Sequence, residues 1–196
     1  MTSLKSRQIR RHYERRIDPL KPSHHILDWG SEREQAMRFE VLADVVTGVP
    51  FASGIQVECD VTNPDCHPPE PHTPTADNLP LDLLDVGCSL PTLPTILDDR
   101  GISTRYVGTD ISSGVLREAR RRHPERQVLE ADVFTEPPFR DKTFDIIFCS
   151  GIFNLKLGNN RDFVFRNLPR LLPLCRRLIV ANFLHIRASR KYSHCY

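Results

Sequence analysis

The chain has 196 residues, which suits one domain or one domain with an arm. Hydrophobic residues make up 39% of it and charged residues 27%, and no apolar run approaches the roughly 18 residues of a membrane-spanning helix, so a membrane protein is excluded. The net charge of +2 is too small to demand a polyanionic partner, and the N-terminus lacks an apolar stretch of signal-peptide type, so we expect a cytoplasmic protein.

Three regions follow one another along the chain. Residues 1–57 form a basic, partly helical arm, residues 58–80 a proline-rich connector, and residues 81–196 the core. In the arm, Ser31 and Glu34 form a capping box, and apolar residues at helical spacing predict a helix from Glu32 to about Val46. Gly48 and Pro50 end this helix.

The core alternates short apolar runs with helical patterns, which predicts an α/β fold, a Rossmann-like doubly wound and mostly parallel sheet. The predicted strands are Leu81–Val86, Arg105–Thr109, Gln127–Ala131, Phe144–Ser150 and Leu178–Leu184. The predicted helices are Thr92–Asp99, Ser112 or Ser113 to Arg122, and Asp162–Leu172 with a kink at Pro169.

Polar side chains stand at the carboxyl ends of these strands, where open parallel sheets bind their ligands. Asp85 closes the first strand, Asp110 the second and Asp132 the third, while Ser150 and Gly151 follow the fourth. The intervals of 25 and 22 residues between the aspartates equal a strand–helix–strand step, so the three carboxylates should gather at one edge.

Asp110 is the most informative of the three positions. A carboxylate after the second strand can accept both hydrogen bonds of a ribose diol, whereas a phosphate there would be repelled. Asp132 at the next strand end could accept from the exocyclic amine of a base. The alternative is that these aspartates only cap turns, a common role for Asp.

Four segments in this order resemble the motifs of class I S-adenosylmethionine-dependent methyltransferases. They are Leu84–Cys88, Tyr106–Ile111, Ala131–Phe134 and Phe144–Ile147. In addition, the segment Trp29–Glu32 with Gln35, Arg38, Phe39 and Leu42, together with Ser150–Asn154, resembles a group of small bacterial-type methyltransferases of unassigned substrate. The resemblance implies S-adenosylmethionine as cofactor and methyl transfer to a small-molecule acceptor as activity.

The resemblance also implies roles by position. Asp85, Gly87 and Ser89 would shape the loop beside the methionine part, Asp110 would hold the ribose, and Ile111 would pack on the adenine. Asp132 and the Val133 amide would read the adenine edge, Ser150 and Gly151 would line the methyl-transfer side, and Arg38 would bind the cofactor's carboxylate from the arm. A surface position on its helix is the alternative for Arg38.

Two features depart from the family pattern. The first motif normally continues Gly-Cys-Gly-x-Gly, but Ser89 and Pro91 stand at the later glycines, where close backbone approach and positive φ favour glycine. This departure predicts weakened cofactor binding. The family fold also continues beyond its fifth strand, so the sheet is expected to be C-terminally shortened, with an open edge. Either the chain is a shortened paralogue or gene fragment, or a protein partner or a second copy covers this edge.

The expected chemistry is direct displacement at an activated sulfonium, which needs positioning and exclusion of water more than an acid or base. No catalytic residue is therefore assigned; Tyr13, Asn154 and His185 are candidates for which a structural role is the alternative. Cys59, Cys66, His67 and His72 match no standard zinc spacing, so no metal is expected.

Three other functions compete with methyl transfer to a small molecule. A non-catalytic interaction module that kept the fold is favoured by Ser89, Pro91 and the shortened sheet. A nicotinamide-dependent oxidoreductase would need Gly-x-Gly-x-x-Gly, which the segment from Gly87 to Thr92 lacks. An RNA methyltransferase is permitted by local arginine clusters but not favoured by the net charge.

Overall fold

The computed structural model describes residues 4–27, 29–48, 79–156, 158–184 and 195. The predicted connector, residues 58–80, lies outside them except for its last two residues, as do His185 and the four Cys and His residues weighed as metal ligands. The helices are α1 (Leu4–Glu14), α2 (Ser23–Ile26), α3 (Glu32–Thr47), α4 (Leu93–Asp99), α5 (Ser113–Arg122), α6 (Asn160–Asn167) and the 3-10 helix η1 (Leu168–Leu174). The strands are β1 (Leu81–Val86), β2 (Thr104–Asp110), β3 (Val128–Glu130), β4 (Phe144–Ser150) and β5 (Cys175–Asn182).

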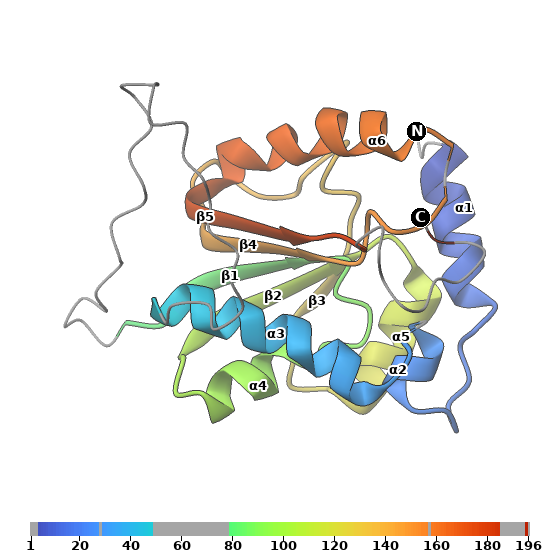
Figure 1. Ribbon diagram of the computed structural model, residues 1–196, viewed down its shortest axis with the longest axis horizontal. Helices are drawn as coiled ribbons and strands as arrows, with labels where there is room; N and C mark the ends of the chain where they lie inside the picture. Colours follow the sequence, from blue (N-terminus) through green and yellow to red (C-terminus); the bar gives the residue numbers. More distant parts are fainter. Residues whose placement is uncertain (1–3, 28, 49–78, 157, 185–194, 196) are drawn as a thin grey trace.

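The strands form one sheet in the order β3-β2-β1-β4-β5, and every pair of neighbours is parallel. The order reverses at β1, which pairs with β2 on one side and with β4 on the other. This is the doubly wound α/β sheet predicted from the sequence. All five carboxyl ends lie at the same edge of the sheet (Figure 1).

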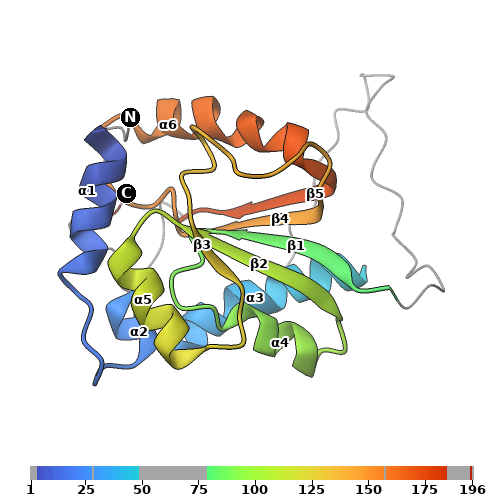
Figure 2. The ribbon, with the colours of Figure 1, turned by 180° about the vertical axis from the view of Figure 1, so that it is seen from behind.

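Alternate residues of the strands build two separate cores. Leu83 and Phe148 face α3 and α4, where they pack with Phe39 and Leu97 among others. Leu84, Ile147 and Cys149 face the opposite side, where they pack with Leu171 and Leu174 of η1. Helices therefore cover both faces of the sheet, with α3 and α4 on one side and α6 with η1 on the other (Figure 2).

Local signals set the helix ends largely as predicted. The Ser31 hydroxyl accepts from the Glu34 amide at 3.1 Å, while the Glu34 carboxylate accepts from the amide of Gly30 at the same distance. Gly48 ends α3 in the left-handed region with φ of 68°. The last predicted helix changes at Leu168 into the 3-10 helix, which contains Pro169.

Helix α1 stands apart from the two layers, beside the carboxyl edge of the sheet (Figures 1 and 2). Polar contacts attach it there: the Ser112 hydroxyl donates to Glu14 at 3.0 Å, and Arg10 forms an ion pair with Glu130 at 3.3 Å. The sequence indicated a partly helical arm but not this helix. None of the helices that the structure describes is long and apolar enough to cross a membrane.

Candidate cofactor site

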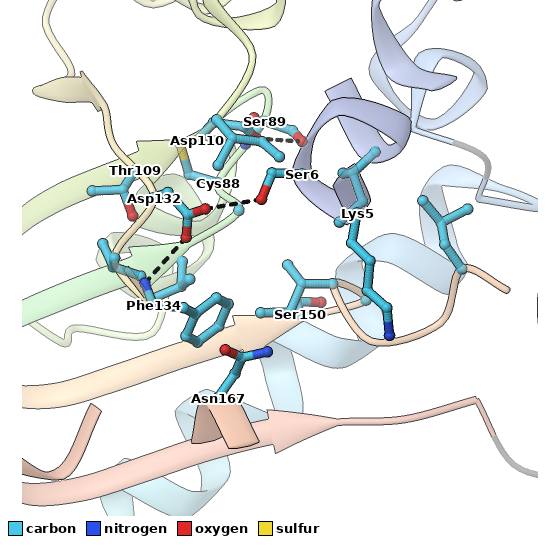
Figure 3. Close-up of a pocket in the computed structure, with 18 of the residues that line it drawn as sticks. Lys5, Ser6, Cys88, Ser89, Thr109, Asp110, Asp132, Phe134, Ser150 and Asn167 are labelled. Carbon is cyan, nitrogen blue, oxygen red and sulfur yellow. Dashed lines mark hydrogen bonds between the residues drawn. The ribbon is translucent and has the colours of Figure 1, made fainter. Parts of the chain in front are cut away.

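A cavity of about 510 Å³ lies at the carboxyl edge of the sheet. Its floor is formed by the loops after β1, β2, β3 and β4, and its walls by α1 and α6 (Figure 3). Nine of the ten predicted binding residues line it: Asp85, Gly87, Ser89, Asp110, Ile111, Asp132, Val133, Ser150 and Gly151. Arg38 is not among the lining residues.

Asp110, at the end of β2, accepts hydrogen bonds on both carboxylate oxygens. Its Oδ1 accepts from the Ser112 amide at 2.9 Å, and its Oδ2 accepts from both the amide and the hydroxyl of Ser89, each at 3.2 Å. Burial raises the pKa of this carboxyl, and the hydrogen bonds from Ser112 and Ser89 oppose that rise. Three of the roughly four acceptor sites of a carboxylate are thus occupied from within the chain.

Ser89, which makes two of these hydrogen bonds, adopts a backbone conformation that glycine favours. Its φ is +49°, in the left-handed region, where a side chain costs roughly 1–2 kcal/mol. Gly87, two residues earlier, also has a positive φ of 73°, and a Cβ there would lie 2.3 Å from Ile152 Cγ2. Gly87 and Ser89 in the loop after β1 thus both adopt a backbone conformation that favours glycine.

Asp85 lies beneath the same loop with only 4% of its surface exposed. The Tyr106 hydroxyl donates to Asp85 Oδ2 at 2.9 Å. Burial, with a smaller contribution from the charge of Asp110, raises the pKa of Asp85 to about 7, against the opposing effect of the Tyr106 bond. The loop is fixed above it, because the Gly87 and Cys88 amides both donate to the Thr109 carbonyl, at 2.7 and 3.0 Å.

The Asp132 side chain, just after β3, forms a hydrogen bond with Ser6 of α1. Its Oδ2 accepts from the Ser6 hydroxyl at 2.9 Å, and its Oδ1 accepts from the Phe134 amide at 3.3 Å (Figure 3). α1 also contributes Lys5, Ile9 and Tyr13 to the cavity wall. Sequence reasoning missed the roles of Lys5, Ser6 and Ile9, although residues 5, 9 and 13 recur at helical spacing and so mark one face of a helix.

A side chain of β5 fixes the residues at the end of β4 by hydrogen bonds. The Asn182 side chain donates to the Ser150 hydroxyl at 3.0 Å and accepts from the Gly151 amide at 2.9 Å. Gly151 has a φ of +74°, and a Cβ there would lie 2.7 Å from the ring of Trp29. Asn182 therefore positions the residues predicted for the methyl-transfer side, a role that no sequence pattern indicated.

Arg38 lies behind Trp29, which itself lines the cavity. The Arg38 guanidinium stacks 3.8 Å from the centre of the Trp29 ring and donates to the Glu34 carbonyl at 2.6 Å. Burial lowers the pKa of Arg38, and the charge of Glu34 opposes this. Among the catalytic candidates, Tyr13 lines the cavity, whereas Asn154 is not among the lining residues and accepts from the Leu184 amide at 2.9 Å.

The chain is similar in sequence to known methyltransferases. Residues 84–173 match a family model described as a methyltransferase domain. A stretch of 74 residues is 31% identical to trans-aconitate 2-methyltransferase of Rhodopseudomonas palustris, and 78 residues are 36% identical to the putative methyltransferase Rv1506c of Mycobacterium tuberculosis. These matches cover 38% and 40% of the chain, and 28% and 45% of the respective relatives, so each spans less than half of the relative.

Among solved structures, the PH0226 protein from Pyrococcus horikoshii OT3 superposes with a TM-score of 0.49 at 17% identity. The superposition covers 79% of this chain and 59% of the archaeal one.

Proposed function

We propose that the chain binds S-adenosylmethionine in the cavity at the sheet edge and transfers its methyl group to a small-molecule acceptor, because residues 84–173 match a methyltransferase domain. The observation that carries this proposal is Asp110, a carboxylate at the end of β2 in a cavity of about 510 Å³, within the range of small-molecule sites. The family implies the methyl donor.

The groups present in the cavity suit a cationic nucleoside. Three of the strand-end residues that line it, Asp85, Asp110 and Asp132, carry carboxyl groups, and Ser150 at the end of β4 is neutral. Carboxyl groups favour a sulfonium and ribose hydroxyls over a phosphate. Asp132 accepts two hydrogen bonds within the chain and so keeps acceptor capacity for an exocyclic amine. Asp110 keeps about one acceptor site, so a ribose diol that needs two requires the Ser89 hydroxyl to turn away.

The chain's own residues bind and position the two substrates. Asp110 would hold the ribose with Ile111 against the adenine, and Asp132 with the Val133 amide would read the adenine edge. Gly87 and Ser89 would shape the surface beside the methionine part, which Asp85 supports from below. Ser150 and Gly151, fixed by Asn182, would face the acceptor.

S-adenosylmethionine supplies a methyl group already activated by its sulfonium. Held by Asp110, Ile111 and Asp132, it would give this methyl group to a lone pair of the acceptor atom and keep the electron pair of the broken carbon–sulfur bond. The products would be the methylated acceptor and S-adenosylhomocysteine. A proton on the acceptor atom leaves to solvent. The protein would contribute alignment and exclusion of water, with α1 as one wall of the cavity, rather than a dedicated acid or base.

A non-catalytic interaction module is the second candidate, and the Ser89–Asp110 contact favours it because that contact occupies the ribose carboxylate. Calorimetric titration of the purified chain with S-adenosylmethionine and S-adenosylhomocysteine separates the two. We expect micromolar binding of both, lost on Asp110→Ala. A folded sample that binds neither would reject the methyltransferase proposal in favour of the interaction module.

A further inference from the structure

The cavity has a second half whose charge is opposite to that of the strand ends. Lys5 of α1, Arg166 of α6 and Arg170 of η1 all line it, together with Asn167. In Figure 3, Asn167 lies on the side of Ser150 away from Asp110 and Ser89, and the Lys5 side chain runs beside Ser150 with its ammonium at the end away from Ser89. The cations belong to α1 and to the wall formed by α6 and η1, not to the strand-end loops.

Two of these cations have no acidic partner among the described residues. The Lys5 ammonium donates to the Asn159 carbonyl at 3.5 Å and lies 5.2 Å from the centre of the Phe163 ring. The Arg170 guanidinium donates to the Phe134 carbonyl through one nitrogen. Neutral groups thus hold both side chains, of which Lys5 is half-buried and Arg170 exposed, and both cations keep further donors for a ligand.

The other charges of the cavity do not neutralise this pair. Arg166 is a weaker member of the group, because it faces Asp162 at 3.8 Å and 78% of its side chain is exposed. The three strand-end aspartates accept hydrogen bonds from serine, tyrosine and backbone donors instead of from Lys5 or Arg170. The cavity is consequently acidic where the cofactor is expected and basic on its other side.

We propose that Lys5 and Arg170 hold a carboxylate group of the acceptor, which makes the acceptor a small organic anion. The inference rests on the proposed function, because it names the second substrate of the same cavity. Ammonium and guanidinium groups form charge-assisted hydrogen bonds with carboxylates, and the guanidinium fork matches both carboxylate oxygens. The carboxylate contributes to binding only, and the methyl group is transferred to another atom of the acceptor as in the proposed function.

The test compares two carboxylates with their uncharged amides on the full chain. Glutarate and tricarballylate are titrated against glutaramide and tricarballylamide, with and without saturating S-adenosylhomocysteine, and binding is followed by the fluorescence of Trp29. Trp29 is the only tryptophan of the chain, and it lines the cavity. We expect at least one carboxylate to bind, and its amide to bind at least about tenfold more weakly.

Variants locate the binding within the cavity. Lys5→Met and Arg170→Met should each weaken carboxylate binding by about tenfold, and Lys5→Arg should restore most of it. Arg7→Met and Arg161→Met are matched controls, because both arginines are exposed on the same two walls and neither lines the cavity. The affinity for S-adenosylhomocysteine, measured by calorimetry, should stay within about twofold in all five variants.

The outcomes separate this inference from the proposed function. Equal binding of acids and amides, no binding of either, or equal losses in the controls would overturn the anionic acceptor, whatever the cofactor does. Absence of S-adenosylhomocysteine binding would overturn the proposed function alone, since the titrations without it still report on Lys5 and Arg170. Loss of carboxylate binding confined to Lys5→Met and Arg170→Met supports the inference.

Discussion

The Ser89 hydroxyl and backbone amide donate to one and the same oxygen of Asp110, each at 3.2 Å. This contact joins the residue that departs from the family's glycine loop to the residue expected to bind the ribose. It also accounts for a serine at a φ of +49°, since two hydrogen bonds to a carboxylate offset part of the cost of a left-handed side chain. We therefore expect Ser89 to compete with the ribose for Asp110.

Removing the Ser89 hydroxyl is expected to tighten cofactor binding. Ser89→Ala frees one acceptor site on Asp110 for the ribose diol, and Ser89→Gly frees the same site and also relieves the backbone strain. S-adenosylhomocysteine affinity measured by calorimetry should rise by about threefold to tenfold in both variants. An unchanged or weaker affinity in Ser89→Ala would show that the hydroxyl does not compete with the ribose.

The two Ser89 variants should differ in stability. Ser89→Ala loses a hydrogen bond and keeps the positive φ, so its free energy of unfolding should fall by about 1 kcal/mol. Ser89→Gly loses the same bond but gains about 1 kcal/mol from relief of the left-handed side chain, so it should stay near the wild type. Urea denaturation followed by circular dichroism measures both, and equal destabilisation would contradict the strain.

Asp110→Asn tests the ribose contact with little change of shape. The amide keeps one acceptor oxygen but loses the charge, so S-adenosylhomocysteine affinity should fall by about tenfold to a hundredfold in calorimetry. Asp141→Asn makes the same change at an exposed aspartate that does not line the cavity, and it should have no effect. Similar losses in the two variants would remove Asp110 from the proposed site.

The sequence predicted the sheet and its polar edge well because both depend on local patterns. A buried strand such as Phe144–Ser150 is an almost continuous apolar run, and the residue that ends such a run lies at the carboxyl edge of a parallel sheet. Asp85, Asp110 and Asp132 could therefore be placed together from their spacing alone, and all three line one cavity.

The parts of the site that the sequence did not predict depend on contacts between distant segments. α1 is mostly polar, so its pattern gave no bounds, and contacts with distant segments, such as Ser6–Asp132 and Glu14–Ser112, show where it packs. The Asn182 side chain serves Ser150 and Gly151 across two neighbouring strands. Such pairs are fixed by tertiary packing, which no periodicity within one segment reveals.

Asp85 should make stability depend on pH between about 4 and 7. Its pKa is about 7 in the folded chain, against 3.8 for an unperturbed aspartate, so the folded form favours the protonated carboxyl. Protonation of Asp85 therefore stabilises the folded chain fully below the pKa of Asp85 in the unfolded chain. This stabilisation is lost as pH rises through the pKa of Asp85 in the folded chain. A shift of about three units corresponds to roughly 4 kcal/mol at most.

Asp85→Asn removes this titration while keeping an oxygen for the Tyr106 hydroxyl. Measured by urea denaturation, the stability of the variant relative to wild type should therefore rise between pH 4 and pH 7, by up to about 4 kcal/mol. Carboxyls whose pKa is lowered in the folded chain, such as Glu118 at about 2, make the stability rise with pH, and they do so at lower pH. They are present in both the Asp85→Asn variant and the wild type, so they cancel in this comparison. Parallel pH profiles would show that Asp85 titrates normally.

Arg38 is predicted to support cofactor binding through Trp29 rather than by direct contact. The family resemblance implied a bond to the cofactor's carboxylate, but the guanidinium stacks on the Trp29 ring and does not line the cavity. Arg38→Ala should weaken S-adenosylhomocysteine binding by about twofold to fivefold, the value of an exposed to half-buried cation–π contact. Arg38→Lys should lose nearly as much, since an ammonium lacks the planar face that stacks on the ring.

A double-mutant cycle separates the two roles of Arg38. If the guanidinium acts by holding Trp29, Arg38→Ala should add almost nothing to Trp29→Ala, because the group it positions is already absent. If it binds the cofactor's carboxylate directly, the two losses should multiply, and Arg38→Lys should keep part of the affinity through its charge. Calorimetry on the two single variants and the double variant decides between a wall-supporting residue and a ligand-binding one.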